Sequence, residues 1–208
     1  MAAPNVDWYF DFVSPFSCIA LHRLAEIPAP VACKPVLFAG LLKHWGHGGP
    51  AELAPKRRWT YRWCQWWAGE LGIAFRFPAA HPFNPLPHLR LAIACGSRLD
   101  AVKRIFDAIW MSGGNAADPE RFAALCRELG VSEDQLGNDE LKAALRKNTS
   151  EAAARGVFGV PSFVVDGEVF WGADAIGFLK AFLADPAVLR NDEIRRLDAL
   201  PVGAARGA

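Results

Sequence analysis

The stretch VDWYFDFVSPFSCIALHRLAEI, residues 6–27, decides the fold. Its first eight residues are rich in aromatic and β-branched types and predict a strand. Ser14 and Pro15 follow where a helix N-cap and a first helical position belong, and a helix-compatible run begins behind them. A second short strand is predicted at about 31–37. The beginning of the chain therefore predicts a βαβ unit, which implies a sheet covered by helices.

A second strand-rich stretch, GVFGVPSFVVDGEVFWGAD, occupies residues 156–174. Residues 157–165 predict a strand, Asp166 and Gly167 a two-residue hairpin turn, and residues 168–171 the return strand. A final helix is predicted behind it, ending at about residue 183. Because both ends of the chain supply strands, we expect one fold that is split by the residues between them.

The middle of the chain is predicted to be an α-helical block. Helical patterns are expected at 56–71, 88–111, 118–129 and 138–154, with loops at 38–55 and, where prolines exclude regular structure, at 76–87. Trp59, Trp63 and Trp66 recur at helical spacing, and we predict that they pack in the core, although such a stripe can also form one wall of a pocket. Residues 186–208 predict a loosely packed tail.

Composition and charge exclude several classes of protein. A chain of 208 residues with 52% hydrophobic composition can bury a core without external staples. Its 23 Lys and Arg residues oppose 22 Asp and Glu residues, so the broad positive field typical of nucleic-acid-binding proteins is missing. The N-terminus lacks the pattern of a secretory signal, and no apolar run nears the roughly 18 residues that span a bilayer. We expect a soluble, cytoplasmic protein that binds a small molecule, not nucleic acid or a membrane.

The cysteines do not form a redox or metal motif. They are Cys18, Cys33, Cys64, Cys95 and Cys126, an odd set without a C-x-x-C pair or a cluster with histidine. We therefore expect reduced, structural thiols and no metal site.

Three short segments could carry chemistry, although each also has a purely structural explanation. Ser14 caps a helix, yet a hydroxyl and free N–H groups at a helix N-terminus also favour an anion such as a thiolate. Val160-Pro161 could be an ordinary trans bond at a strand start, but we predict a cis bond that exposes the Val160 backbone to a peptide-like ligand. Asp174 is a natural N-cap, and its carboxylate could instead hold the α-amino group of such a ligand.

The order of these segments resembles the thioredoxin-like 2-hydroxychromene-2-carboxylate isomerase family. FDFVSPFS near the start and VFGVPSFVVDGEVFWG near the end carry the resemblance, which covers roughly residues 5–185. Kappa-class glutathione transferases are near relatives, and periplasmic disulfide oxidoreductases are more remote. The C-P-x-C motif of the oxidoreductases aligns with Ser14-Pro15-Phe16-Ser17, so neither position supplies a thiol for a disulfide cycle.

The resemblance implies an α/β, thioredoxin-like fold with an all-α helical insertion. Its parts are expected to be a discontinuous thioredoxin-like domain at 1–42 and 156–185, a helical insertion subdomain at 43–155, and a C-terminal tail at 186–208. Because members of the family are usually homodimers, the resemblance also implies a homodimer.

The resemblance further implies a glutathione-dependent isomerase of an aromatic oxo-acid, acting in aromatic catabolism with glutathione as a regenerated cofactor. Ser14 is the expected catalytic residue, because it would hydrogen-bond the glutathione sulfur and help to hold it as a thiolate. The expected glutathione-binding residues are Lys56, His47, Val160, Pro161, Ala173 and Asp174. Lys43 and Arg57 are expected to hold the substrate carboxylate, and Asn84 to line the site.

Two departures from the family pattern leave alternatives open. His47 stands where relatives usually have asparagine, and Ala175 stands where many have arginine. Either change could weaken glutathione binding or alter the substrate. One alternative is a kappa-like glutathione transferase that conjugates glutathione to electrophiles, and another is a non-catalytic thioredoxin-like binding module. Product analysis and glutathione affinity would separate the three.

Overall fold

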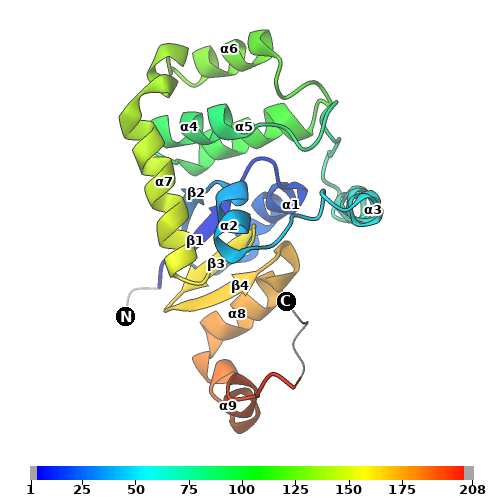
Figure 1. The fold of residues 1–208 in the computed structure, drawn as a ribbon, viewed down its shortest axis with the longest axis vertical. Coiled ribbons are helices and arrows are strands. Elements are labelled where there is room, and N and C mark those ends of the chain that lie inside the picture. Colours follow the sequence, from blue (N-terminus) through cyan, green and yellow to red (C-terminus); the bar gives the residue numbers. More distant parts are fainter. Residues whose placement is uncertain (1–3, 204–208) are drawn as a thin grey trace.

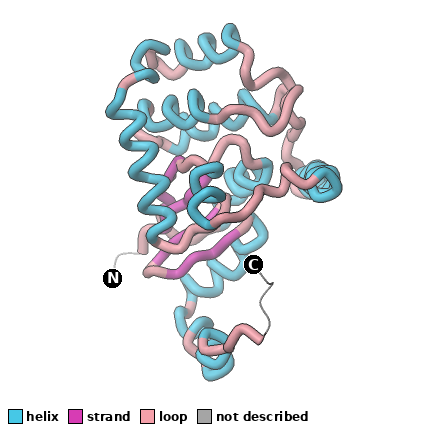
Figure 2. The backbone as a smooth tube through the Cα atoms, in the orientation of Figure 1, coloured by secondary structure: helices cyan, strands magenta, loops and turns pink. Residues whose placement is uncertain are grey.

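The four strands of one sheet come from both ends of the chain in the computed structural model, which describes residues 4–203. The strands are β1 (Val6–Phe10), β2 (Val31–Pro35), β3 (Ser162–Val165) and β4 (Glu168–Trp171). Their order is β2-β1-β3-β4, with β1 parallel to β2 and the other two pairs antiparallel. The predicted βαβ beginning and the predicted hairpin therefore join in one sheet, whose strands are magenta in Figure 2.

Two of the strands are shorter than predicted. The first ends at Phe10 and not at residue 13, because the chain turns there toward Ser14. The third begins only at Ser162, since Pro161 has no N–H to donate to the ladder. The hairpin turn is as predicted: Asp166 and Gly167 both have positive φ, 50° and 85°, as a two-residue turn between twisted strands requires.

Helices lie above, beside and below the sheet in Figure 1, and those above it form a helical block. Their bounds are α1 (Pro15–Arg23), α2 (Phe38–Trp45), α3 (Ala54–Glu70), α4 (Leu86–Ala94), α5 (Leu99–Trp110), α6 (Pro119–Glu128), α7 (Asp139–Ala154), α8 (Ile176–Ala184) and α9 (Asp192–Asp198). The α-helical middle of the chain predicted from its hydrophobic pattern is confirmed.

The prediction of a loop over residues 38–55 was wrong for its first half, which forms α2. The first N–H groups of this helix are held by distant side chains: Phe38 N–H donates to Asp11 at 2.8 Å, and Leu37 N–H donates to Thr149 at 3.0 Å. A local reading of the sequence misses such caps because both acceptors lie far away along the chain. Helix α2 also crosses the domain boundary that was expected between residues 42 and 43.

Two other predicted segments differ from the structure. The helical pattern at 88–111 is divided between α4 and α5, because Gly96 and Ser97 adopt positive φ of 68° and 52°. The tail contains a 3-10 helix (Pro186–Leu189) and α9, and no residue of α9 is buried. Residues 204–208 of the predicted tail lie outside the described residues.

The core lies between the sheet and the helical block. Trp8, Phe10, Phe12 and Phe106 are fully buried there, and their rings stack or meet edge-on at centroid distances of 4.4 to 6.2 Å. The indole N–H of Trp110 donates to the Phe12 carbonyl at 2.9 Å, so the helical block is tied to the loop that leads to Ser14. Helix α3 lies to one side in Figure 1 and packs against α1. Space for a site is left between α3, α2 and the end of the sheet.

Candidate active site

Ser14 occupies the N-cap of α1, as predicted. Its backbone is extended (φ −88°, ψ 116°), its hydroxyl oxygen accepts the Ser17 N–H at 3.1 Å, and Pro15 is the first residue of the helix. The hydroxyl also donates to the Val160 carbonyl at 3.4 Å, across 146 residues of sequence. The capping interpretation is therefore correct, and the tertiary structure additionally brings Ser14 against the loop that contains Pro161.

The Val160–Pro161 peptide bond is cis, which confirms the prediction. Val160 is followed by β3 and its carbonyl is turned toward Ser14, so its backbone does not continue the sheet. Within residues 4–203 the Val160 N–H donates no hydrogen bond. An unpaired N–H next to an open cavity offers one half of a β-type pairing to a peptide-like ligand.

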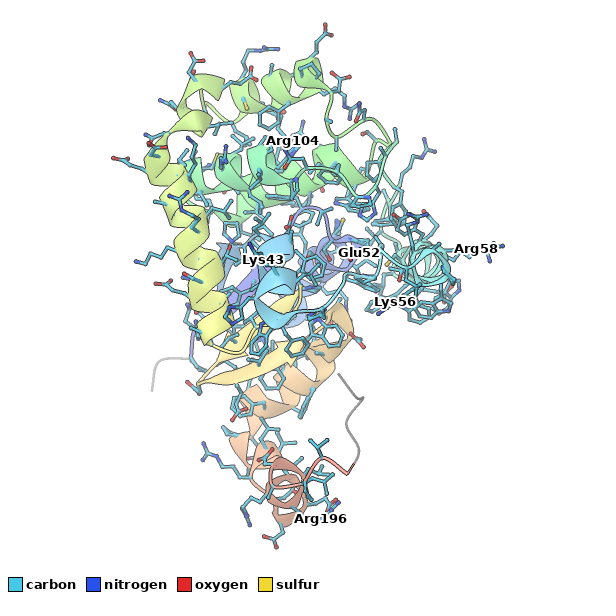
Figure 3. The ribbon with its side chains drawn as sticks, viewed as in Figure 1. Lys43, Glu52, Lys56, Arg58, Arg104 and Arg196 are labelled. Atoms are coloured by element: carbon cyan, nitrogen blue, oxygen red, sulfur yellow. The ribbon has the colours of Figure 1, made fainter. Side chains whose placement is uncertain are left out.

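A cavity of about 490 Å³, here called the larger cavity, opens beside this loop. Five of the predicted site residues line it: His47, Lys56, Val160, Pro161 and Asp174. They come from the loop after α2, the start of α3, the loop before β3 and the turn after β4. Figure 3 shows Lys56 on the side of α3 toward β4, while Arg58 points away from the molecule. The structure thus brings together residues that are up to 127 positions apart, from 47 to 174.

Two long-range hydrogen bonds position the far wall of the larger cavity. The indole N–H of Trp45 donates to the Val157 carbonyl at 2.9 Å. One ring nitrogen of His47 lies 3.3 Å from the Phe158 carbonyl and the other lies 3.3 Å from the Gly48 carbonyl. The Trp45 bond and the His47–Phe158 contact attach the end of α2 and the loop after it to the segment that precedes the cis bond. His47 therefore holds this side of the cavity in place and also lines it.

Asp174 does not cap the final helix, which corrects the prediction. It lies in a 3-10 helix (Ala173–Ala175) that precedes α8, and the N-cap residue of α8, Ala175, makes no side-chain capping bond. Gly172 has φ of 105°, and a Cβ atom at this position would collide with the Asp174 carboxylate. The glycine therefore lets the carboxylate fold over residue 172, where it lines the larger cavity exposed to solvent.

The tryptophan stripe of α3 forms a wall of the larger cavity, so the prediction of core packing was wrong. Trp59 is 61% exposed and stacks on Trp63 with ring centroids 5.6 Å apart and planes 12° apart. Trp67 completes the wall, whereas Trp66 is 54% exposed and lies outside it. The helical spacing placed these residues on one face correctly, but α3 packs its buried Cys64 and Ala68 against the core, leaves Trp63 and Trp67 half-buried and exposes Trp59 and Trp66.

A smaller cavity of about 220 Å³ adjoins the larger one and shares Phe16, Phe38, Pro50 and Thr60 with it. Ser14 lines the smaller cavity, and Ser17 lines neither. Of the described residues around the smaller cavity none is lysine or arginine, while two, Asp11 and Glu52, carry carboxyl groups. The predicted catalytic hydroxyl therefore stands where an apolar chamber meets a more polar one.

Asp11, which was not among the predicted site residues, lines the same cavity as Ser14 and has a strongly raised pKa. It is fully buried, and its carboxylate accepts the Val13 N–H at 3.0 Å and the Phe38 N–H at 2.8 Å. Burial raises the pKa of Asp11 to about 7, against the lowering effect of these two hydrogen bonds. The available signal was a charged residue in the otherwise apolar run YFDFV.

Four predicted site residues do not line either cavity. Lys43 is exposed on α2 and Arg57 is exposed on α3. The Asn84 side chain accepts the Leu86 N–H at 3.1 Å, which makes it a local cap at the start of α4. Ala173 is buried, and its carbonyl accepts a hydrogen bond from the Arg23 guanidinium at 2.8 Å. Of the cations proposed for the site, only Lys56 borders a cavity.

The environment of the cysteine thiols does not favour redox chemistry. All five cysteines are free and buried, as expected for structural thiols. Burial raises the pKa of Cys18 strongly and that of Cys33 and Cys64 to about 12, so these groups stay protonated near neutral pH. The cysteine nearest to Ser14 in the helix, Cys18, thus cannot replace the missing nucleophilic thiol.

Residues 4–203 contain no group of three or more His, Cys, Asp or Glu side chains arranged to hold a metal ion. None of the helices in that range is both long enough and apolar enough to cross a membrane.

Comparisons with known proteins agree with this architecture. The family model for the DSBA-like thioredoxin domain matches residues 5–184. A 2-hydroxychromene-2-carboxylate isomerase from Pseudomonas sp. (strain C18) is 32% identical over 187 residues, which cover 84% of this chain and 88% of that protein. Glutathione s-transferase kappa 2 from Caenorhabditis elegans is 27% identical over 208 residues, which cover 87% and 92%.

The fold agrees as well. A solved structure of a 2-hydroxychromene-2-carboxylate isomerase superposes with a TM-score of 0.77 at 25% identity, covering 95% of this chain and all of that one. The α/β, thioredoxin-like fold with a helical insertion and the resemblance inferred from the terminal motifs are both confirmed.

Proposed function

Because the chain belongs to the 2-hydroxychromene-2-carboxylate isomerase family of DSBA-like thioredoxin domains, we propose that it is a glutathione-dependent isomerase of an aromatic oxo-acid. The observation that carries the proposal is the position of Ser14. A hydroxyl stands where disulfide oxidoreductases have a thiol; it lines the smaller cavity and contacts the carbonyl of Val160, which lines the larger one.

The surroundings of Ser14 suit a thiolate from a ligand. Its hydroxyl makes a long, weak hydrogen bond of 3.4 Å to the Val160 carbonyl, so the hydrogen can turn toward a better acceptor. Pro15 has no N–H, and the Phe16 N–H behind it donates no hydrogen bond within the described range. One hydroxyl and one free N–H at a helix N-terminus are donors that favour a negatively charged sulfur.

The larger cavity suits the rest of glutathione. The unpaired Val160 N–H can pair with the cysteinyl backbone, and the exposed Asp174 carboxylate can accept the α-amino group of the γ-glutamyl end. Lys56 is the available cation for a ligand carboxylate. Gly159 allows the Trp171 indole to lie against the backbone in the wall of the larger cavity, since a Cβ atom at residue 159 would come within 2.6 Å of the indole nitrogen.

The residues of the chain have separate roles in the proposed reaction. When bound, glutathione supplies a thiolate that adds reversibly to a conjugated double bond and leaves after rotation, so it is regenerated. Ser14 holds the negative charge at the sulfur by a hydrogen bond, and the end of α1 stabilises it further. The apolar walls of the smaller cavity, including Phe16 and Phe83, exclude water from the reacting carbon atoms.

A thiolate titration tests the proposal directly. Glutathione bound to the wild-type protein should show thiolate absorption in the near ultraviolet at a pH where free glutathione is a thiol. Incubation with an aromatic oxo-acid should then change its cis/trans ratio while the amount of free glutathione stays constant. Turnover without glutathione, or the absence of any glutathione binding, would refute the proposal and favour the non-catalytic module.

A kappa-like glutathione transferase is the second candidate, and one observation favours it. The described lining of the smaller cavity carries two carboxyl groups and neither lysine nor arginine, which suits an uncharged electrophile better than a carboxylate. A transferase would consume glutathione and leave a stable thioether, so mass spectrometry of the product mixture separates the two activities.

The proposal includes a cytoplasmic homodimer that acts in aromatic catabolism, as the family resemblance implies. Free, buried cysteines agree with a reducing compartment. The exposed indoles of Trp59 and Trp66 provide apolar surface on α3 that a second copy could cover. Light scattering after size-exclusion chromatography measures the oligomeric state, and a monomer at micromolar concentration would contradict the dimer.

A further inference from the structure

Tyr61 and His81 meet at the wall of the smaller cavity. Tyr61 comes from α3 and His81 from the proline-rich loop before α4, and both line the cavity together with Ser14. The Tyr61 hydroxyl lies 2.5 Å from Nδ1 of His81 and 2.9 Å from the His81 carbonyl oxygen. On its other side the imidazole contacts the Val13 carbonyl, with Nε2 at 2.7 Å. One imidazole ring thus separates the Tyr61 hydroxyl from the peptide that leads into Ser14.

The partners of His81 determine where its hydrogen atoms lie. A peptide carbonyl only accepts, so Nε2 must carry a hydrogen and donate it to Val13. In a neutral imidazole Nδ1 is then an acceptor, so the single hydrogen of the Tyr61 hydroxyl has two acceptors on His81, Nδ1 and the carbonyl oxygen. Burial lowers the pKa of His81 and raises the pKa of Tyr61, so both groups stay uncharged near neutral pH. The pair therefore presents a neutral phenol as a hydrogen-bond donor.

The aromatic surroundings of the pair hold it in place. The His81 ring meets Phe77, Phe83 and Trp110 at centroid distances of 5.6, 6.3 and 5.6 Å, and the Tyr61 ring lies 4.4 Å from Phe77. These rings restrict the imidazole to one orientation. A hydroxyl held in a fixed position needs little movement of heavy atoms when its hydrogen turns to a new acceptor in the cavity.

The smaller cavity has few other groups that could stabilise a negatively charged oxygen. Neither lysine nor arginine lines it within residues 4–203, and the Asp11 and Glu52 carboxyl groups would repel such an oxygen when ionised. The side-chain hydroxyls that can donate on its described wall are those of Ser14, Thr60 and Tyr61. Ser14 is assigned to the sulfur in the proposed function, and the Tyr61 hydroxyl is the one coupled to a second ring.

We propose that Tyr61 is a catalytic residue that donates its hydroxyl hydrogen to the substrate oxygen on which negative charge develops, and that His81 is its positioning residue. The substrate class is an aromatic compound with a phenol or enol oxygen within reach of this hydroxyl. When that oxygen enters, the Tyr61 hydrogen turns from its acceptor on His81 to the ligand, while the Nε2 hydrogen stays bonded to the Val13 carbonyl. Only hydrogen bonds change, and the proton stays on Tyr61. The inference rests on the proposed function for its reaction, but not for the binding of the oxygen.

A chromogenic phenol tests the oxygen site without glutathione or turnover. 4-Nitrophenol is titrated with the glutathione-free protein, and the pKa of the bound probe is measured from its nitrophenolate absorption. Tyr61→Phe should weaken nitrophenolate binding about tenfold or more, since a hydrogen bond to a charged oxygen is lost, and should raise the pKa of the bound probe. Tyr9→Phe is the matched control, because the Tyr9 hydroxyl contacts Arg155 outside both cavities. Equal probe binding by the wild type and Tyr61→Phe would overturn the proposal.

Kinetics and glutathione binding separate this inference from the proposed function. With an active wild type, Tyr61→Phe should lower kcat about 10- to 100-fold, leave KM within threefold and leave the stabilisation by glutathione unchanged. His81→Gln keeps a donor for Val13 but loses the ring acceptor, so it should produce a smaller loss. The double variant should be no slower than Tyr61→Phe, because the two residues act as one unit. If the kcat losses of the two single variants multiply in the double variant, or if the melting temperature falls while kcat stays unchanged, the pair is only a structural tether.

An inactive wild type that still shifts the pKa of the bound probe through Tyr61 would refute the proposed isomerase and retain the oxygen site.

Discussion

The larger and the smaller cavity meet at Phe16 and Thr60, but they are built in opposite ways. The larger cavity is bordered by exposed groups, among them Lys56, Asp174 and Trp59, whose side chains point into it from separate loops and helices. The smaller cavity has mostly apolar walls, and most of its polar side chains are already hydrogen-bonded to one another or to the backbone, namely Asp11, Ser14, Glu52, Tyr61 and His81.

This difference predicts how each cavity recognises a ligand. Exposed charges bind through solvent-screened attraction, so a single substitution in the larger cavity should change affinity modestly. Donors that are already positioned in the smaller cavity would stabilise negative charge that develops on the substrate during the reaction, so they should strongly affect the reaction rate. Substitutions in the smaller cavity are therefore expected to change kcat, and those in the larger cavity to change glutathione affinity.

The largest expected effect is at Ser14, on the boundary. Ser14→Ala should lower glutathione-dependent isomerisation by roughly one to three orders of magnitude, the scale for losing one preorganised donor. It should cost about 1 kcal/mol of stability, because the N-cap bond to the Ser17 N–H is lost. Steady-state kinetics and denaturant unfolding measure the two effects.

Ser17→Ala is the control for this comparison, since the Ser17 hydroxyl is buried without a partner and lines neither cavity. Wild-type turnover by a Ser14→Ala protein that still binds glutathione would show that Ser14 is only a helix cap.

The next effect concerns Asp11 and the pH dependence of stability. Because burial raises the folded-state pKa of Asp11 from 3.8 to about 7, the folded state binds this proton more tightly than the unfolded state. The contribution of Asp11 to the free energy of unfolding is fully present below about pH 4 and is lost as the pH rises to about 7. The total loss is up to about 4 kcal/mol. Urea unfolding of the wild type and of Asp11→Asn across this range measures the difference.

The difference between these two proteins should shift steadily in favour of Asp11→Asn as the pH rises. A difference that stays constant from pH 4 to pH 8 would mean that Asp11 is ionised throughout and that its two N–H partners outweigh its burial.

Asp174 tests the larger cavity. Glutathione at 100 times its dissociation constant should stabilise the wild type by about 2.7 kcal/mol and raise its melting temperature. Asp174→Ala should reduce this shift, because the α-amino group loses its carboxylate partner. Asp134→Ala is a matched control, as Asp134 is also an exposed carboxylate in a 3-10 helix but lines neither cavity. Equal shifts for Asp174→Ala and the wild type would remove Asp174 from the ligand site.

The smallest expected effect compares two lysines. Lys56→Ala should weaken glutathione binding several-fold, because its ammonium group borders the larger cavity at an exposed position. Lys43→Ala should leave the affinity unchanged, since Lys43 lines neither cavity. Isothermal titration calorimetry with glutathione measures the affinity of both variants. A greater loss of affinity in Lys43→Ala than in Lys56→Ala would mean that the cavity lined by Lys56 is not the glutathione site.

Local sequence patterns predicted a large part of this molecule correctly. The Ser14-Pro15 cap and the hairpin turn at Asp166-Gly167 depend on neighbours within a few residues. Apolar periodicity showed that the tryptophans of α3 share one face. It did not show whether that face is buried, because burial depends on which side of the helix the rest of the chain covers.

The sequence by itself determined the class of fold, the cis bond at Val160 and the absence of a redox thiol at Ser14, since each follows from residue types at short range or from the terminal motifs. Only the tertiary structure decided which residues share a cavity. It brought His47 and Asp174 together, excluded Lys43 and Asn84, and paired Tyr61 with His81. It also buried Asp11, whose carboxylate accepts the N–H of Phe38 at the start of α2. Such contacts join residues far apart in the chain, and they depend on how helices pack, which no local pattern specifies.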